Sequence, residues 1–445
     1  MNLRDLYNSK AIALRQTQVA SNSKPYIGSV LFPNKKKMGL DLKWIKTSKG
    51  LPVSLMPSAF DAKSTIRSRE GLDTAKTQMA FFRESMLVKE EDEQEIMRIQ
   101  DSSDPYAQAV LDHIYDDANT LVEGAKVVPE RMRMQLLAPE DGSPKINITA
   151  NGVPYEYNYD PNGTFAANNF TQLLGTAMWS QTSTADPITD VMLAQDAIEE
   201  ATGERPAYML ISKRTMTQLV KNEILRGYIL AQNATANIFM NEARVKQVFA
   251  DELGISIIVY TKQFKDEAGV AHKFFPDGFA TLLPEGALGN TWYGMTPEER
   301  TLAGSGVADV AIVEGGIAVA VTTTSDPVNT KTTVSEIVLP SFERMDSVYC
   351  IKADTAVEAV EGTVAEGSSS GTTKVTVSTT VGSGESLVVS TSATALPIYG
   401  QDLSAWTAYT SGSNITAADG STFYLAIVKD GLCLKAAAFT ADSAA

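Results

Sequence analysis

The sequence is poor in the residues on which most catalytic and metal sites depend. It has only two histidines and two cysteines in 445 residues. His113 and His272 lie in different segments, and Cys350 and Cys433 are too few and too far apart for a disulfide scaffold. We expect both cysteines to be buried small hydrophobic residues in a protein of a reducing compartment.

Motifs that mark common enzyme classes are also missing. There is no Cys-x-x-Cys, His-x-x-x-His, Gly-x-Ser-x-Gly or P-loop sequence. His113 lies among acidic residues of a predicted helix, where a metal site could be built, but such a charge run usually forms a solvated helix face. We therefore expect no catalytic site, no metal and no cofactor. A carbohydrate-processing enzyme would need a carboxylate pair that only folding could bring together.

No long hydrophobic run is present either. The longest candidate, Val307 to Val321, contains Asp309, Glu314 and two glycines, and it is too short to cross a bilayer. The N-terminal residues alternate between apolar and charged, so no signal peptide is visible. We expect a protein without contact to a membrane that is soluble in the cytoplasm when it is synthesised.

The charge is unevenly distributed. The net charge is -15 and the isoelectric point about 4.8, which argues against affinity of the whole chain for nucleic acid. Residues 1–76 nevertheless carry 14 basic and 5 acidic side chains, a net of +9, whereas residues 84–123 carry 2 and 12, a net of -10. These runs are either solvated surfaces or two halves of a contact, in which the arm of one subunit lies on the acidic face of the next.

The second interpretation identifies candidate subunit-contact residues. The basic residues are Lys35, Lys36, Lys37, Lys43 and Lys46. The acidic residues are Glu90, Glu91, Asp92, Glu93 and Glu95. Pairing within one subunit would satisfy the same charges. A nucleic-acid patch is a further alternative for the three consecutive lysines, although they lack the interleaved aromatic residues of a single-strand binder.

Periodicity in the N-terminal third predicts an arm, a hairpin and helices. Residues 1–30 are predicted to form a partly helical arm, and alternation in residues 31–82 predicts a long β-hairpin too polar to bury both faces. Asp104-Pro105 predicts a helix N-terminus, with the helix running towards Gly124. A second helical piece is predicted over Pro129 to Leu137.

The middle of the chain alternates between strand and helix patterns. Residues 145–160 predict a hairpin around Asn151-Gly152. Asp186-Pro187 predicts a helix start and Gly203 its stop. The further predicted elements are the strand Pro206 to Ile211, the helix Lys213 to Leu230, and strands at Ile255 to Tyr260, Gly278 to Pro284 and Val307 to Val321. This alternation over residues 187–350 favours an α/β or α+β domain.

The composition changes after Ala353. Residues 354–445 contain no arginine and are rich in Ser, Thr, Gly and Ala. Short apolar strands and a hairpin signal at Lys429-Asp430-Gly431 predict a small all-β module of the Ig-like sandwich type. A disordered tail is the alternative, and aromatic residues such as Trp406 and Tyr424 argue against it.

The segment from Leu339 to Tyr349, Leu-Pro-Ser-Phe-Glu-Arg-Met-Asp-Ser-Val-Tyr, resembles the closing motif of phage lambda-type major capsid proteins, the coat protein E family. In that family a strand with a similar proline and an acidic-basic pair ends the shell domain. Val30-Leu31-Phe32-Pro33 resembles the start of the family's extended loop. The acidic helix after Pro105 is similar in placement to its spine helix, and Gly278 to Pro284 resembles a strand-turn pattern of its axial domain.

The resemblance covers much of residues 1–353 and implies an α+β Hong Kong-type tailed-phage fold. The implied parts are an N-terminal arm (1–30), an extended β-loop (31–82), a peripheral domain with a spine helix (83–185 with 320–353) and an axial domain (186–319). The module at 354–445 lies beyond the family's usual end, and we expect it to decorate the surface.

The function implied by the resemblance is that of a major capsid protein. Hexamers and pentamers of one chain would close into an icosahedral shell around double-stranded DNA, without sequence-specific contact. An arm and a loop too long to be buried in their own subunit also need a partner chain. The expected partners are further copies of the chain, a separate scaffolding protein, a portal and, as a further candidate, a decoration protein.

The expected location is the virion capsid, with the host cytoplasm during assembly. Two other functions stay open from the sequence. One is an encapsulin-like compartment shell that shares the fold. The other is a cell-surface adhesive protein that uses residues 354–445, against which the missing signal peptide counts.

Overall fold

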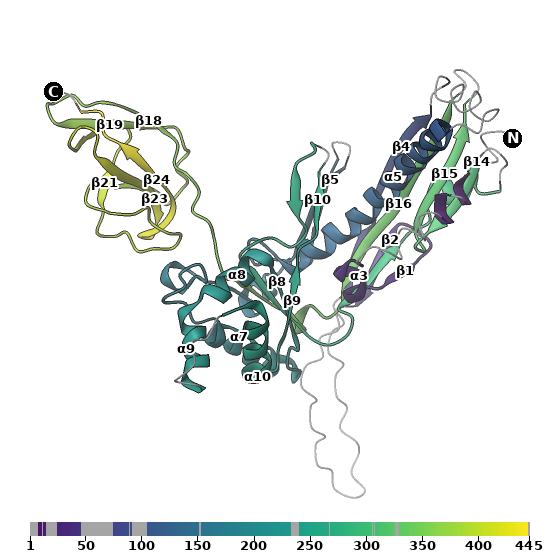
Figure 1. The fold of residues 1–445 in the computed structure, drawn as a ribbon, viewed down its shortest axis with the longest axis horizontal. Coiled ribbons are helices and arrows are strands. Elements are labelled where there is room, and N and C mark those ends of the chain that lie inside the picture. Colours follow the sequence, from purple (N-terminus) through teal and green to yellow (C-terminus); the bar gives the residue numbers. More distant parts are fainter. Residues whose placement is uncertain are drawn as a thin grey trace, which may run out of the picture.

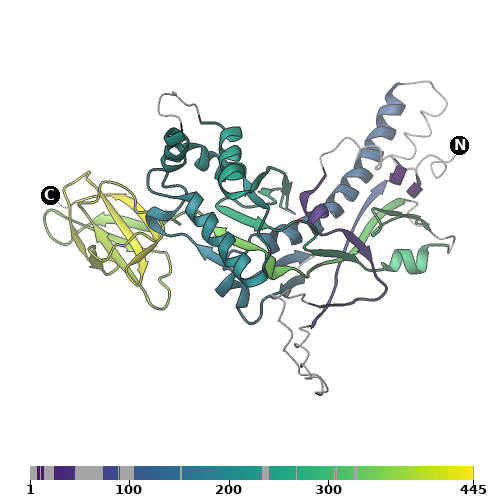
Figure 2. The same ribbon diagram turned by 90° about the horizontal axis from the view of Figure 1, so that it is seen from below.

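The computed structural model describes residues 8–10, 12–14, 25–45, 74–88, 90, 105–150, 153–232, 240–266, 268–304, 306, 308–324 and 329–443. These residues form a body with two sheets and a group of C-terminal strands, which Figure 1 and Figure 2 show from two sides. Helix and strand are mixed throughout the body, as the predicted α+β class requires. Within the described ranges, no helix is long and apolar enough to span a membrane.

The first part of the body is a long sheet with a long helix on one face (Figure 1). Its central strand β16 pairs with β4 along one edge, and with β15 and β13 along the other. Pro340 of β16 lies beyond the end of β4, so its missing N–H costs no bond to that strand. The strands are β1 (Asn34–Lys36), β4 (Ala80–Val88), β13 (Gly289–Tyr293), β14 (Ala308–Val313), β15 (Ile317–Thr323) and β16 (Thr330–Phe342).

The helix α5 runs unbroken from Pro105 to Leu137. The prediction that it would end near Gly124 and resume at Pro129 is wrong. Pro129 cannot donate a backbone hydrogen bond, and glycine has a low helix propensity. The helix nevertheless continues because α5 packs along β16 and β4, and most helical stability in proteins comes from such tertiary contacts.

Hairpins project from the body. β2 pairs with β3 from Asp41 opposite Gln78 to Ile45 opposite Thr74, where the sequence predicts the extended β-loop. Residues 46–73 of that loop lie outside the described residues. The predicted hairpin around Asn151-Gly152 is confirmed by the pairing of β5 with β6. The hairpin strands are β2 (Asp41–Ile45), β3 (Thr74–Gln78), β5 (Lys145–Ala150), β6 (Val153–Asn158), β10 (Gln263–Lys265) and β11 (Ala271–Lys273).

The second part of the body is a five-stranded sheet in the order β7-β17-β12-β8-β9. The predicted helix start and stop beside it are confirmed, because the Asp186 side chain accepts from the Thr189 N–H and Gly203 has a φ of 72°. The strands are β7 (Phe170–Gln172), β8 (Tyr208–Ser212), β9 (Ser256–Tyr260), β12 (Phe279–Leu283) and β17 (Tyr349–Lys352). The helices are α7 (Pro187–Thr202), α8 (Lys213–Lys221), α9 (Glu223–Gln232) and α10 (Glu242–Leu253).

Two sequence predictions differ from the structure in this region. The predicted helix from Lys213 to Leu230 is divided at Asn222, whose side-chain oxygen accepts from the Leu225 N–H and so starts α9. The predicted strand over Val307 to Val321 is the hairpin β14–β15. This hairpin and β13 pair within the long sheet and not within the five-stranded sheet. Further short helices in the described part of the chain are α3 (Ile27–Leu31), α6 (Thr164–Asn168), η1 (Gly175–Ala177), η2 (Glu298–Leu302) and η3 (Met345–Ser347).

The C-terminal strands form two sheets around a hydrophobic core of their own. One sheet has the order β18-β19-β22 and the other β21-β20-β23-β24. Asp430 and Gly431 connect β23 to β24 with φ values of 52° and 81°, the conformation of the tight hairpin turn that the sequence predicts there. The strands are β18 (Gly362–Glu366), β19 (Thr372–Val377), β20 (Glu385–Ser390), β21 (Thr407–Tyr409), β22 (Asn414–Thr416), β23 (Thr422–Lys429) and β24 (Leu432–Thr440).

A short loop of this C-terminal part contacts the body. The Gly175 N–H donates to the Tyr399 carbonyl at 3.0 Å, and the Tyr399 side chain packs against the core of the five-stranded sheet. A Cβ atom at Gly400 would lie only 2.7 Å from the Cβ of Leu174, so this approach requires glycine. The C-terminal strands therefore meet the body at a defined contact in addition to the connecting chain.

A buried ion pair on α5 connects several segments of the body. The Glu130 carboxylate accepts from the Gly28 N–H at 3.1 Å, the Tyr260 hydroxyl at 2.6 Å and the Arg133 guanidinium at 3.2 Å. Arg133 in turn donates to the Thr291 hydroxyl at 2.9 Å and to the Asn34 side chain at 3.0 Å. The pair therefore links α5 to α3, β1, β9 and β13.

Replacing Glu130 tests how far the body depends on this pair. In Glu130→Gln the Arg133 cation stays buried without its counter-charge, so we expect the free energy of unfolding to fall by about 3–5 kcal/mol. The control is Glu199→Gln, which breaks the half-exposed pair with Arg205 and should cost less than about 1 kcal/mol. Urea unfolding followed by tryptophan fluorescence measures both. Equal losses in the two variants would contradict a central role for Glu130.

Candidate functional site

The residue types that carry most catalysis do not converge in the described part of the chain. Among the described residues, no three His, Cys, Asp or Glu side chains are grouped so that they could hold a metal ion. His113 lies within α5, and its side chain is outside the description. Both cysteines are free and buried, as expected. Burial raises the pKa of the Cys350 thiol to about 12 and that of Cys433 to about 11, so neither is a thiolate near neutral pH.

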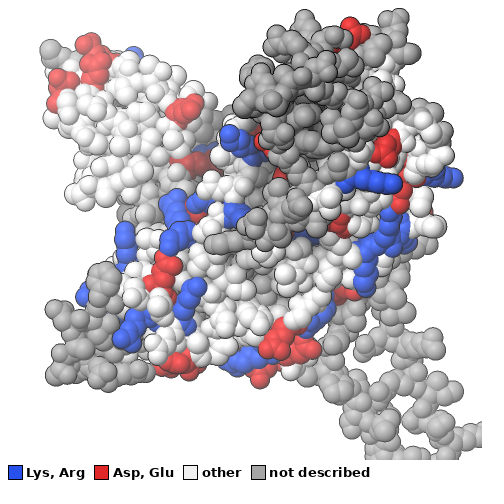
Figure 3. Space-filling view, turned by 45° about the vertical axis from the view of Figure 1, so that its right-hand side comes forward, with Lys and Arg blue, Asp and Glu red and all other residues white. Residues whose placement is uncertain are grey.

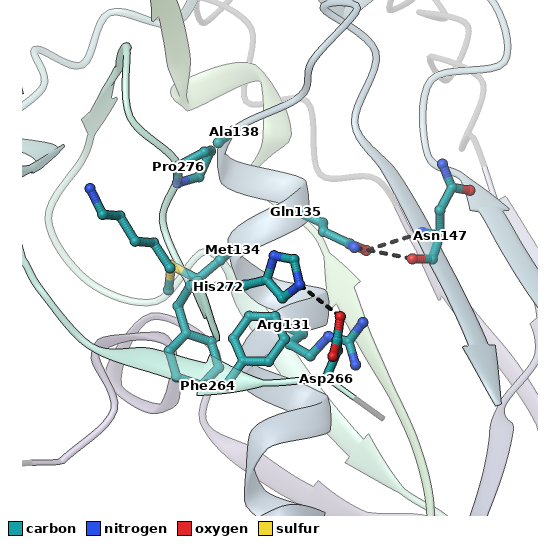
Figure 4. Close-up of a pocket in the computed structure, with 11 residues that line it drawn as sticks. Arg131, Met134, Gln135, Ala138, Asn147, Phe264, Asp266, His272 and Pro276 are labelled. Atoms are coloured by element: carbon teal, nitrogen blue, oxygen red, sulfur yellow. Dashed lines mark hydrogen bonds and ion pairs between the residues drawn. The ribbon is translucent and has the colours of Figure 1, made fainter. Parts of the chain in front are cut away.

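A hollow with polar side chains in its lining lies where α5 meets two hairpins, and Figure 4 shows it. Its volume is about 490 Å³. The His272 ring contacts Asp266 at 2.8 Å, and this hydrogen bond holds the pKa of the Asp266 carboxyl below its usual range. Gln135 of α5 exchanges two hydrogen bonds with the Asn147 backbone, at 3.1 and 3.0 Å. The Arg131 guanidinium lies over a Phe264 ring.

These contacts pair the polar groups of the hollow with one another. The His272 and Asp266 side chains come from one hairpin, β10–β11, and both are partly exposed. A general acid or base needs a proton donor or acceptor aimed at a substrate position, whereas these groups are aimed at each other (Figure 4). The contacts of Gln135 and Arg131 also hold the hairpins against α5.

The three consecutive lysines lie on and beside β1, at the edge of the long sheet. Lys36 forms an ion pair with Glu299 of η2 within the same subunit. The Lys35 ammonium lies 5.6 Å from the Trp292 ring centre, and the Lys37 backbone N–H donates to the Tyr293 carbonyl at 2.8 Å. At least one of the three predicted contact lysines therefore has an acidic partner in its own chain.

The other predicted contact residues are only partly within the described structure. Lys43 lies in β2, where its side chain is outside the description. Glu90 is exposed. Lys46, Glu91, Asp92, Glu93 and Glu95 lie outside the described residues. The contact between the basic and acidic sets therefore stays a prediction.

Sequence reasoning missed two acidic residues of η2. Glu298 is buried, accepts from the Ser335 hydroxyl at 2.7 Å and pairs with Arg83 at 2.6 Å. Its neighbour Glu299 binds Lys36. The run Pro297-Glu298-Glu299-Arg300 looks like an exposed helix start in the sequence, and its contacts with β1, β4 and β16 depend on long-range pairing of the sheet. Over the face in Figure 3, basic and acidic side chains are interspersed rather than gathered into one patch.

A family model described as phage major capsid protein E matches residues 12–353. No curated protein matches the chain. A phage-related protein from Bordetella bronchiseptica RB50 is 16% identical, with 76% of this chain and 95% of that chain covered and a TM-score of 0.46.

A second solved structure is the capsid of cyanophage A-1(L). It is 12% identical, with 74% of this chain and 92% of that chain covered and a TM-score of 0.42. Both TM-scores lie below 0.5, so neither structure assigns a function to this chain.

Proposed function

The chain belongs to the phage major capsid protein E family, and we propose that it closes, as hexamers and pentamers, into an icosahedral shell around double-stranded phage DNA. The observation that carries this proposal is the match over residues 12–353, which span the body from the arm to β17. The protein is thus a shell-forming major capsid protein of the virion capsid. An encapsulin-like compartment and a cell-surface adhesive protein are not favoured.

The family is one of structural proteins, and we extend the proposal to a chain without catalytic activity. The mutual pairing of the polar groups around His272 supports this. Assembly would take place in the host cytoplasm with a separate scaffolding protein and a portal, and a decoration protein is a further candidate partner. The packaged DNA would meet an acidic chain with a net charge of -15, so contact with it would be weak and independent of sequence.

We propose domain boundaries that follow the pairing of the strands. Residues 1–30 would act as the arm and 31–82 as the extended β-loop. Residues 83–169 with about 289–347 would form the peripheral domain, because β13 to β16 pair in the long sheet beside α5. The axial domain would then hold residues 170–288 with 348–353. Residues 354–445 would be a surface module.

Microscopy tests the assembly proposal directly. Expressed with its scaffolding protein, the chain should yield closed particles in negative stain and sediment far ahead of a single subunit. The physical reason is that obligate interfaces of about 2,000–5,000 Å² are too large to stay exposed on a free subunit. A species that stays monomeric at every salt concentration would contradict the proposal.

The surface module should be dispensable for the shell. The chain is best cut after Ala356, because the side chains of Asp354 and Thr355 still accept hydrogen bonds from Gln218 and Gln172 of the body. We expect particles of unchanged diameter that lack density on the outer surface, since the module has its own core. Cryo-electron microscopy of both particles measures this. Missing density on the inner surface, or a cut protein that does not fold, would refute the placement.

Charge reversal tests the predicted contact between the basic and acidic segments. Changing Lys35, Lys36 and Lys37 to Glu should slow assembly by about tenfold or more, because like charges across an interface cost several kcal/mol. Reversing the acidic run at residues 90–95 in the same protein should restore part of the rate. Light scattering measures assembly, which should also slow with rising salt, since the screening length is about 10 Å at 0.1 M.

The internal pair of Lys36 provides the matched control. Glu299→Gln breaks that pair but leaves the lysines free to meet a neighbouring subunit, so assembly should not slow. If Glu299→Gln slows assembly as much as the triple reversal, the lysines act within their own subunit. If the double reversal gives no rescue, the two segments do not meet.

A further inference from the structure

One buried carboxyl group of the body has no partner among the residues that the structure describes. Glu336 of β16 is 1% exposed, and within that described part neither of its side-chain oxygens has a hydrogen-bond partner. Two other buried glutamates differ from it, because Glu130 is paired with Arg133 and Glu298 with Arg83. A buried polar group without a partner is rare in native proteins and costly, so it calls for an explanation.

Glu336 lines a cavity of about 210 Å³ between α5 and the long sheet. In the strand register Phe82 lies opposite Glu336 and Glu84 opposite Val334, so these four side chains share the face of the sheet that α5 covers. The walls are apolar, with Leu121 and Val128 from α5 and Phe82 and Val334 from the sheet. Of the two acidic residues that line the cavity, Glu84 is exposed and Glu336 is buried.

Gly124 of α5 also lines the cavity, and because glycine has no side chain the cavity stays open on the helix side. A Cβ atom built on Gly124 would have no neighbouring atom within 4 Å. Arg83 lines the cavity as well, but its guanidinium is bound by Glu298 and lies over the Phe81 ring. No basic side chain within the described residues therefore pairs with Glu336.

The isolated subunit bears an electrostatic cost at this position. Burial raises the pKa of Glu336 well above its usual range, the Arg133 guanidinium opposes this shift, and the Glu314 carboxylate adds to it. A metal ion would not relieve the cost, since Ca²⁺ takes about six to eight oxygen ligands and the walls here are apolar. A lysine or arginine side chain suits the cavity better, because its methylene stem can lie along apolar walls while its charged end meets a carboxylate.

We propose that this cavity receives a lysine or arginine side chain from the basic segment, residues 1–76, of a second copy of the chain. The proposal rests on the assembly function proposed above and names the contact that would serve it. Charge complementarity points to that segment, because its net charge is +9 while two acidic residues, Glu84 and Glu336, line the cavity. The incoming cation would pair with Glu336 once the interface has excluded water.

Two substitutions separate this role from a purely structural one. Glu336→Leu removes an unpaired buried carboxyl, so the urea midpoint of the isolated subunit should rise. The same change should slow assembly by about tenfold or more, the effect of losing one charge-assisted hydrogen bond. A structural role would move both measurements in the same direction. A higher urea midpoint together with a lower assembly rate is therefore expected only if a partner in the assembled shell binds Glu336.

The second substitution closes the cavity from the helix side. Gly124→Leu should slow assembly at least as much as Glu336→Leu, while helix propensity makes the subunit no less stable. Its matched control is Gly227→Leu, because Gly227 also lies in a helix with open space beyond its Cβ position, on α9 away from the cavity. The control should assemble at the wild-type rate.

A zero-length carbodiimide reagent can identify the donor in wild-type shells built from mixed light and heavy-nitrogen subunits. We expect peptides in which Glu84 is joined to a lysine of residues 1–76 from another copy. If both cavity variants assemble at the wild-type rate, or if Glu84 is coupled only within one subunit, the proposal is overturned. A wild-type chain that forms no shells would instead overturn the proposed function itself.

Discussion

The body depends most on the buried ion pair between Glu130 and Arg133. Two charges removed from water are stable only when their remaining hydrogen-bonding groups are also satisfied. Here the hydrogen-bond partners of the two side chains come from α3, β1, β9 and β13. The space around the pair is tight, since a Cβ atom at Gly28 would lie 2.3 Å from a Glu130 oxygen. Burial and the Glu130 carboxylate also raise the pKa of Tyr260, which keeps its hydroxyl a donor.

Three buried glutamates of the body therefore differ in how they are paired. Glu130 holds the subunit together, and Glu298 fastens η2 to β4 and β16 through Arg83 and Ser335. Glu336, by contrast, has no hydrogen-bond partner among the described residues of its own subunit. Since the chain belongs to a family of shell-forming proteins, interactions that are incomplete in one subunit and complete in the shell would favour assembly over the free subunit.

Local patterns in the sequence predicted the structural features that depend on residues close together in the chain. The helix limits at Asp186 and Gly203 and the turn at Asp430-Gly431 follow from short-range chemistry, and the structure confirms them. Contacts between distant segments could not be predicted in this way. The continuity of α5 through Pro129 comes from its packing on β16. Glu336 is buried because α5 covers the face of the sheet on which its side chain lies. For the same reason, the sequence did not reveal the pairing of Lys36 with Glu299.

The pairing of β4 with β16 has a consequence for how the chain folds during synthesis. The two strands are separated by about 250 residues, yet they form the longest pairing in the centre of the sheet. A ribosome must therefore deliver nearly the whole body before β4 meets its partner, and such high contact order makes folding slow. Until then a nine-residue strand with apolar side chains stays unpaired, which makes the nascent chain prone to aggregation and a natural client for chaperones.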